Sequence, residues 1–112
     1  MGLGFASEAS RIRELGRLST ADIARATGAD DSTVRAWVNE TRSPSGERAE
    51  RLAELSSVVE RLTRVIDADY IPVWLRKPNP LLDDEKPIDL VASADYRRVS
   101  KVIGALEGTP IS

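Results

Sequence analysis

The polar side chains best placed to do chemistry lie between residues 32 and 42. Arginine can pair with guanine through two hydrogen bonds, and asparagine can pair with adenine in the same way. The candidates for reading bases are Ser32, Thr33, Arg35, Ala36 and Asn39. Arg42 is a further candidate for DNA binding: it and Arg25 could contact phosphates from the rim, or could equally be solvated. The competing interpretation is an ordinary polar helix face, because Asp30 and Asp31 beside these residues would repel phosphate.

Catalytic chemistry has little support in this chain. Its 112 residues include no His and no Cys, which excludes disulfides, the usual zinc sites and nucleophile pairs of the Cys–His or Ser–His type. The carboxylate pairs Asp67/Asp69 and Asp83/Asp84 are candidates for acid–base chemistry. Their places at helix ends and in a loop are explained better by capping and solubility. We therefore expect a protein that is not an enzyme and that carries no metal and no cofactor.

The charge balance argues against a strong electrostatic attraction to nucleic acid. The formal net charge is −2, and residues 1–43 hold six Arg against six Asp or Glu. DNA binding would therefore depend on local placement of Arg or on dimerisation. No apolar run reaches transmembrane length, and the N-terminus lacks a basic region followed by an apolar stretch. A cytoplasmic location is expected.

The elements that must position the candidate DNA contacts form a helix-turn-helix over residues 20–39. Ser19 and Asp22 have the spacing of a shortened capping box, so the first helix begins near Thr20. Gly28 supplies the sharp turn, and Asp30 or Asp31 caps the second helix, which ends near Asn39. Ala24 lets the two helices approach, and the apolar side chains between them are Ile23, Val34 and Trp37.

Two further helices flank this motif. The first carries Phe5, Ala9, Ile12 and Leu15, with Gly16 as its C-cap. The second is long, Ser45–Ile66, with one apolar stripe and a charged face that we expect to be solvated and to hold the pairs Glu47–Arg51 and Glu60–Arg64. Val58 and Val65 widen the stripe, which indicates a second buried surface and predicts a homodimer.

Residues 67–112 predict a second, smaller helical module. A short helix at 67–76 is broken by Pro78-Asn79-Pro80, and the turn at Leu81-Leu82 ends in an acidic loop. Another helical turn follows at 87–91, and a last helix runs from Tyr96 to Leu106 before Gly108. Trp74 should anchor the module, and Asn79 should bond nearby backbone groups. The fold class is all-α, with domains at 1–66 and 67–112.

The order of these pieces resembles the Xre/MbcA/ParS toxin-binding family, and most of all its mycobacterial MbcA type. The resemblance rests on an Xre-type helix-turn-helix and a long helix, followed by Trp74-Leu75, Pro78-Asn79-Pro80-Leu81-Leu82 and Lys86-Pro87-Ile88-Asp89-Leu90. Many members have a Gly-rich turn before the last helix, where this chain has Ser93-Ala94-Asp95.

What the resemblance implies is an antitoxin of a type II toxin–antitoxin pair. It would bind a RES-domain toxin that degrades NAD⁺ and block its active site, and some members also bind operator DNA. The toxin-binding residues would be Trp74, Pro78, Asn79, Leu81, Leu82, Pro87, Thr109, Pro110, Ile111 and Ser112, with the segment Gly108–Ser112 reaching into the NAD⁺ pocket. The alternative for that segment is a disordered terminus with no role.

The alternative function is that of a free-standing transcriptional regulator, in which the C-terminal module only dimerises or senses a ligand. Tight association with a toxin from a neighbouring gene would favour the antitoxin. Operator binding with no protein partner would favour the regulator.

Overall fold

The computed structural model describes residues 5–108, and its side chains from residue 8 onward. The regular secondary structure of the described residues is helical, with no β-strand, so the predicted all-α class is confirmed. The elements in chain order are α1 (Phe5–Gly16), α2 (Thr20–Thr27), α3 (Asp31–Val38), α4 (Gly46–Leu62), η1 (Ala68–Tyr70), α5 (Ile71–Arg76), η2 (Pro80–Leu82), α6 (Pro87–Ala92) and α7 (Tyr96–Leu106).

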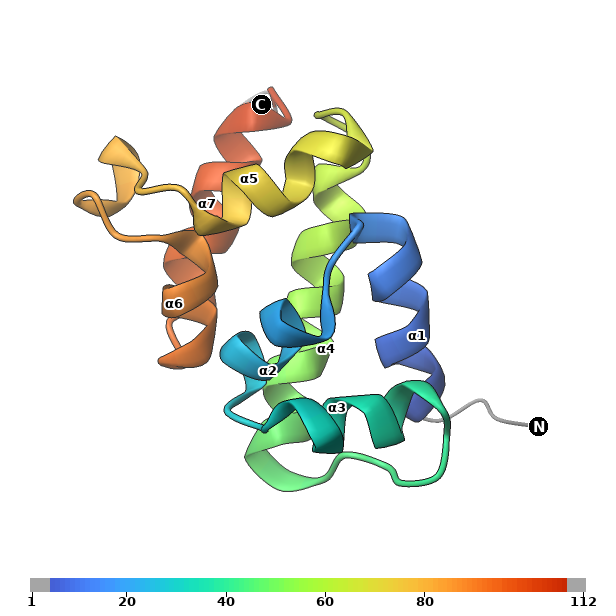
Figure 1. The fold of residues 1–112 in the computed structure, drawn as a ribbon. Helices are drawn as coiled ribbons and strands as arrows, with labels where there is room; N and C mark the ends of the chain where they lie inside the picture. Colours follow the sequence, from blue (N-terminus) through green and yellow to red (C-terminus); the bar gives the residue numbers. More distant parts are fainter. Residues whose placement is uncertain (1–4, 109–112) are drawn as a thin grey trace.

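The arrangement is centred on α4 (Figure 1). Helix α1 packs on one side of α4, and α6 and α7 pack on the other, while α3 and α5 lie at opposite ends of the molecule in this view. The apolar stripe of α4 explains its central place, because Leu52, Leu55, Val59 and Leu62 are all fully buried. Both halves of the chain therefore contribute to one continuous core.

Local capping chemistry fixes the helix-turn-helix. The Ser19 hydroxyl accepts from the backbone N–H of Asp22 at 3.1 Å, and the Asp22 carboxylate accepts from the backbone N–H of Ser19 at 3.0 Å. This is the predicted capping box. Gly28 has a φ of 81°, and Asp30 caps α3 by accepting from the N–H of Thr33 at 2.9 Å. Trp37 is 2% exposed, so its predicted place in the core is confirmed.

Gly16 has a different role from the predicted C-cap. It is the last residue of α1, and the left-handed residue that follows it is Arg17, with a φ of 56°. A Cβ atom at Gly16 would lie 3.0 Å from the Val59 side chain. The absence of a side chain thus lets α1 approach α4 closely, and the expectation based on turn conformation was wrong.

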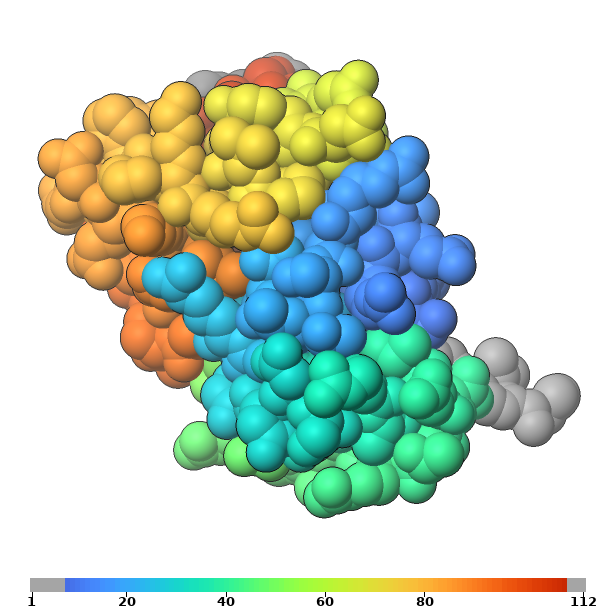
Figure 2. All heavy atoms as spheres, viewed as in Figure 1, coloured from blue at the N-terminus to red at the C-terminus, as the bar shows by residue number. Residues whose placement is uncertain are grey.

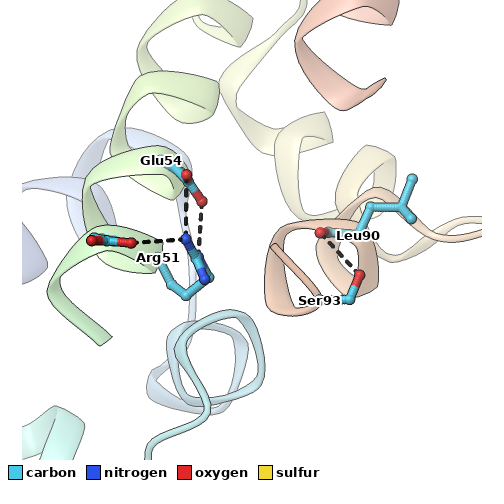
Figure 3. A network of polar contacts seen from close by, with 5 residues as sticks. Arg51, Glu54, Leu90 and Ser93 are labelled. Carbon is cyan, nitrogen blue, oxygen red and sulfur yellow. Dashed lines mark hydrogen bonds and ion pairs between the residues drawn. The ribbon is translucent and has the colours of Figure 1, made fainter. Parts of the chain in front are cut away.

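The charged face of α4 is covered more than the sequence predicts. The helix ends at Leu62, not Ile66, and its expected i,i+4 ion pairs are replaced by others. Arg51 pairs with Glu54 at 2.9 Å and with Glu50, while Glu60 accepts from Arg11 of α1 at 2.7 Å. Figure 3 shows Arg51 and Glu54 facing each other along α4. The prediction of a solvated face is confirmed for the first turns, where Glu47, Arg48 and Glu50 are exposed. It is wrong for the last turns, because Glu60 pairs with α1 and Arg61 pairs with Glu107 at the end of α7.

Helix α7 is fastened to α4 by a polar network. Arg61 donates to both carboxylate oxygens of Glu107 at 2.9 Å and to the Ser100 hydroxyl at 2.6 Å. Val58, which was expected to belong to a second buried surface, is fully buried within the single chain. The argument for a homodimer from Val58 therefore fails, because packing inside the protomer accounts for its burial.

The C-terminal helices begin and end close to the predicted residues. Pro72 lies in the first turn of α5, and the chain enters α7 through Ala94, which has a left-handed φ of 67°. A glycine would take that conformation without steric cost. Within residues 5–108, no helix is both long and apolar enough to span a membrane.

Candidate functional site

The C-terminal half exposes an apolar surface where α5 passes into η2. Three large side chains there are unusually open, with exposed fractions of 41% at Tyr70, 46% at Val73 and 71% at Leu81. We define the α5–η2 surface as Tyr70, Val73, Trp74, Pro78, Pro80 and Leu81. Figure 2 shows this part of the chain, in yellow and light orange, gathered at one end of the molecule. Large apolar side chains gathered in one exposed place are typical of a protein-binding surface.

Asn79 holds the loop of this surface in one shape. Its side-chain oxygen accepts from the N–H of Leu81 at 2.9 Å, as predicted for a polar residue between two prolines. Its backbone carbonyl accepts from the N–H groups of Leu82 and Asp84, and its N–H donates to the carbonyl of Glu85 at 3.0 Å. These four bonds close the loop on itself, so Leu81 is presented to solvent from a rigid frame.

Some predicted toxin-binding residues support this surface without contributing to it directly. Leu82 is 1% exposed and Pro87 is buried, so neither side chain is available to a partner. Leu82 anchors the loop in the core immediately beside exposed Leu81. Trp74 is half-buried and packs against the core, as expected of an anchor. The predicted contacts Thr109, Pro110, Ile111 and Ser112 lie outside the described residues.

Sequence reasoning missed Tyr70, Val73 and Pro80 as surface residues. A signal for Val73 was available in the helical period. Ile71 and Leu75 are four residues apart and both fully buried, which places Val73, midway between them, on the opposite face of the helix. For Tyr70 and Pro80 no comparable signal exists, because their exposure depends on how η1 and η2 meet α5.

Two bidentate ion pairs join this module to the helix-turn-helix. Arg76 of α5 donates to both oxygens of Asp22 at 2.8 and 2.6 Å, and Arg25 of α2 donates to both oxygens of Asp89 at 2.7 and 2.9 Å. Arg25 is thus engaged with α6, and the suggestion that it contacts phosphate was wrong. Asp22 caps α2 and also holds α5, so one carboxylate serves both halves of the chain.

The electrostatics of Asp22 fit this double role. Burial by itself raises the pKa of a carboxyl group, but hydrogen bonds from Arg76 and from Ser19, together with the charge of Arg76, outweigh that effect. The pKa of Asp22 therefore lies below its usual range, and Asp22 is ionised at neutral pH. The same contact raises the pKa of Arg76.

The outward face of α3 is polar and carries few contacts. Ser32, Arg35, Asn39 and Arg42 are exposed, and within the described part of the chain neither arginine forms an ion pair. Thr33 is only 9% exposed, so its side chain is not presented on this face and it is a wrong candidate for reading bases. Hydrogen bonding from Thr33 lowers the pKa of Asp30, which keeps a negative charge at the start of α3.

The fold and its exposed apolar surface together define a class of protein. A helix-turn-helix is rigidly joined to a small helical module with an exposed apolar face. Residues 10–55 match a helix-turn-helix family, and residues 61–108 match the antitoxin Xre/MbcA/ParS C-terminal toxin-binding domain.

Individual relatives agree with this class. The mycobacterial cidal antitoxin MbcA of Mycobacterium tuberculosis is 34% identical over 95 residues, which cover 85% of this chain and 83% of MbcA. A probable mycobacterial cidal antitoxin of the same organism is 35% identical over 78 residues, or 70% of this chain and 66% of that protein. A chain from the crystal structure of the M. tuberculosis MbcT–MbcA toxin–antitoxin complex superposes with a TM-score of 0.83 and 33% identity, covering 95% of this chain and 96% of that chain.

The protein belongs to the Xre/MbcA/ParS family of antitoxins. This is a family of binding proteins, so the prediction that the chain is not an enzyme agrees with it.

Proposed function

We propose that this antitoxin binds a RES-domain, NAD⁺-degrading toxin through its α5–η2 surface and blocks the toxin's active site. The observation that carries the proposal is the exposed apolar surface within residues 61–108, the part that matches a toxin-binding domain. The relative MbcA occurs in a solved complex with the toxin MbcT, which supports a stable protein–protein complex here. We further expect both proteins to act in the cytoplasm.

Leu81 should contribute most to toxin binding. Its 71% exposure leaves most of the side chain available for burial. Burying a leucine side chain fully contributes about 1.5–3 kcal/mol, and interface energy concentrates in a few such residues. The fixed loop adds to this, because little conformational entropy is lost when the toxin docks on a frame that is already ordered.

The second part of the proposed mechanism concerns residues 109–112. The last described helix is held at its end by Arg61 and Glu107, and the chain leaves it at Gly108, with a φ of 62°. We expect Thr109-Pro110-Ile111-Ser112 to extend from this fixed point into the NAD⁺ pocket of the toxin. Pro110 limits the conformational freedom lost on docking.

Binding and inhibition can be tested separately with the purified full-length chain and its toxin. Leu81→Asp should weaken the complex in a calorimetric titration, whereas Leu15→Asp, at an exposed leucine of α1, should not. Deleting residues 109–112 should leave binding largely intact and restore part of the NAD⁺ consumption. Full binding by Leu81→Asp would contradict the proposed surface, and full inhibition by the truncated chain would contradict the proposed role of the tail.

We also propose that the antitoxin binds operator DNA through Ser32, Arg35, Asn39 and Arg42, which share the exposed face of α3. With no net positive charge in the first 43 residues, this binding should need two copies of the motif side by side. A homodimer is expected on that ground. Sedimentation that shows only a monomer at micromolar concentration would contradict it.

A further inference from the structure

A small hollow lies within the α5–η2 surface. It has a volume of about 180 Å³ and is lined by Tyr70, Trp74, Lys77, Pro78, Asn79 and Pro80. Pockets for drug-sized molecules occupy about 300–1,000 Å³. The hollow is therefore suited to one large side chain of a partner and too small for a free metabolite of nucleotide size. Its walls are the rings of two aromatic residues and two prolines.

The polar side-chain groups of this hollow are mainly donors without acceptors. The indole N–H of Trp74, the ammonium of Lys77 and the amide NH₂ of Asn79 donate no hydrogen bond to another described residue. The Asn79 oxygen, by contrast, is already used by the N–H of Leu81. No buried side-chain nitrogen or oxygen in the described part lacks a partner, so these three donor groups are open to solvent. A partner that displaced their water would need acceptors to replace it.

The charged side chain among those that line the hollow is that of Lys77. Lys77 has no ion-pair partner among the described residues. The acidic loop that follows is partly neutralised, because Arg98 pairs with Asp83 at 3.2 Å and with Glu85 at 3.7 Å. An acceptor that also carries a negative charge suits this environment better than a neutral carbonyl.

We propose that the hollow anchors a segment of the toxin in which a large apolar side chain stands next to an Asp or Glu. This inference rests on the proposed function, and it identifies the chemistry of the partner at that surface. The apolar side chain fills the space between Trp74 and the two prolines. The carboxylate accepts from Lys77 and from the amide of Asn79. The apolar and the acidic side chains of the segment therefore contact different walls of the hollow.

Asn79→Asp tests the donor part of the proposal with little change in shape. The substitution keeps the oxygen that accepts from Leu81 and replaces the NH₂ donor by a second, negatively charged acceptor. Lys77→Glu reverses the free charge. The matched control for the charge reversal is Lys101→Glu on the exposed face of α7.

The measurement is the calorimetric affinity of each full-length variant for the purified toxin, at low and at high salt. We expect Asn79→Asp and Lys77→Glu to weaken binding by about 10- to 100-fold, and Lys101→Glu to leave it near the wild-type value. The loss in Lys77→Glu should shrink at high salt. The melting temperature of Asn79→Asp should stay close to that of the wild type, which separates lost contact from lost fold.

Two negative results have different meanings. If the wild type binds the toxin and both hollow variants bind equally well, the anchor is wrong while the antitoxin function stands. If the wild type itself does not bind a RES-domain toxin, the proposed function is wrong.

Discussion

The two surfaces that this antitoxin offers to partners differ in chemistry. The outward face of α3 is polar, with Arg35 and Asn39 exposed and Asp30 keeping a negative charge beside them. The α5–η2 surface is apolar, with Leu81 71% exposed on a loop that its own hydrogen bonds hold in shape. Apolar area of this kind gains free energy only by burial against another protein, whereas the α3 face needs hydrogen-bonding partners. The proposed toxin-binding surface is therefore better suited to a protein partner than the α3 face is.

The surfaces lie at opposite ends of the molecule but depend on one core. Helix α3 reaches the core through Trp37 and Val34, and α5 reaches it through Ile71 and Leu75. Between them, the ion pair of Asp22 with Arg76 ties α2 to α5. Each surface therefore has its own proposed partner, while both need the same core in order to fold.

The largest expected effect comes from the shared core. Trp37→Ala should destabilise the fold by about 3–5 kcal/mol, because a buried aromatic side chain is lost and a cavity remains. Both toxin binding and DNA binding should fall with the melting temperature. An unchanged melting temperature would contradict the placement of Trp37 in the core.

The next effect concerns the junction. Asp22→Ala removes one of the two hydrogen bonds of the α2 capping box and leaves Arg76 without its partner, which should cost about 2–3 kcal/mol of stability. Asp89→Ala is the matched control, because it breaks the more exposed pair with Arg25 and should cost less than about 1 kcal/mol. Urea unfolding of both variants measures the difference. Equal losses would show that the capping role of Asp22 adds nothing.

The Asp22 contribution should also depend on pH. Its pKa is lower in the folded protein than in the unfolded chain. The stabilisation is then fully present above the unfolded pKa of about 3.9 and is lost as the pH falls through the folded value. The difference in melting temperature between wild type and Asp22→Ala should shrink below about pH 4. A constant difference down to lower pH would contradict the ion pair.

The sequence allowed the helices to be predicted far better than the contacts between them. The caps and the turn of α2 and α3 depend on contacts between residues close together in the sequence, and the ends of both helices could be predicted for that reason. The residues concerned are Ser19, Asp22, Gly28 and Asp30. The pairing of Asp22 with Arg76 joins residues 54 positions apart and depends on how α5 packs against α2. No local pattern contains that information.

The same limit applies to the candidate site. Leu81 and Leu82 are adjacent and chemically identical, yet one is 71% exposed and the other 1%. Their order in the loop is decided by the bonds of Asn79, which the sequence indicated only in general terms. Thr33 failed as a base-reading candidate for a similar reason, since the burial of one helix face depends on its neighbours.

A smaller effect should distinguish the two surfaces by function. Arg35→Ala should lower the preference for the operator over unrelated DNA by about 1–3 kcal/mol. It should leave toxin affinity and stability unchanged. A gel-shift titration and a calorimetric titration with the toxin measure the two sides. If the wild type shows no DNA sequence preference, alone or with toxin, the proposal that α3 binds operator DNA is wrong.

The smallest effect concerns the turn before α7. Ala94 holds a left-handed φ of 67°, and Ala94→Gly should stabilise the protein by up to about 1 kcal/mol. The control is Ala53→Gly, at an exposed position in the middle of α4, where the same change should destabilise by about 0.5–1 kcal/mol. Thermal unfolding of the two variants should shift in opposite directions. Destabilisation by both would show that Ala94 is not strained.

We expect the toxin to bind the α5–η2 surface and not the face of α3. Amide hydrogen exchange of the full-length antitoxin, with and without its toxin, examines both ends of the molecule in one measurement. The predicted result is slower exchange over residues 70–86 in the complex and no change over residues 31–38. Protection confined to α2 and α3, with residues 70–86 unchanged, would contradict it.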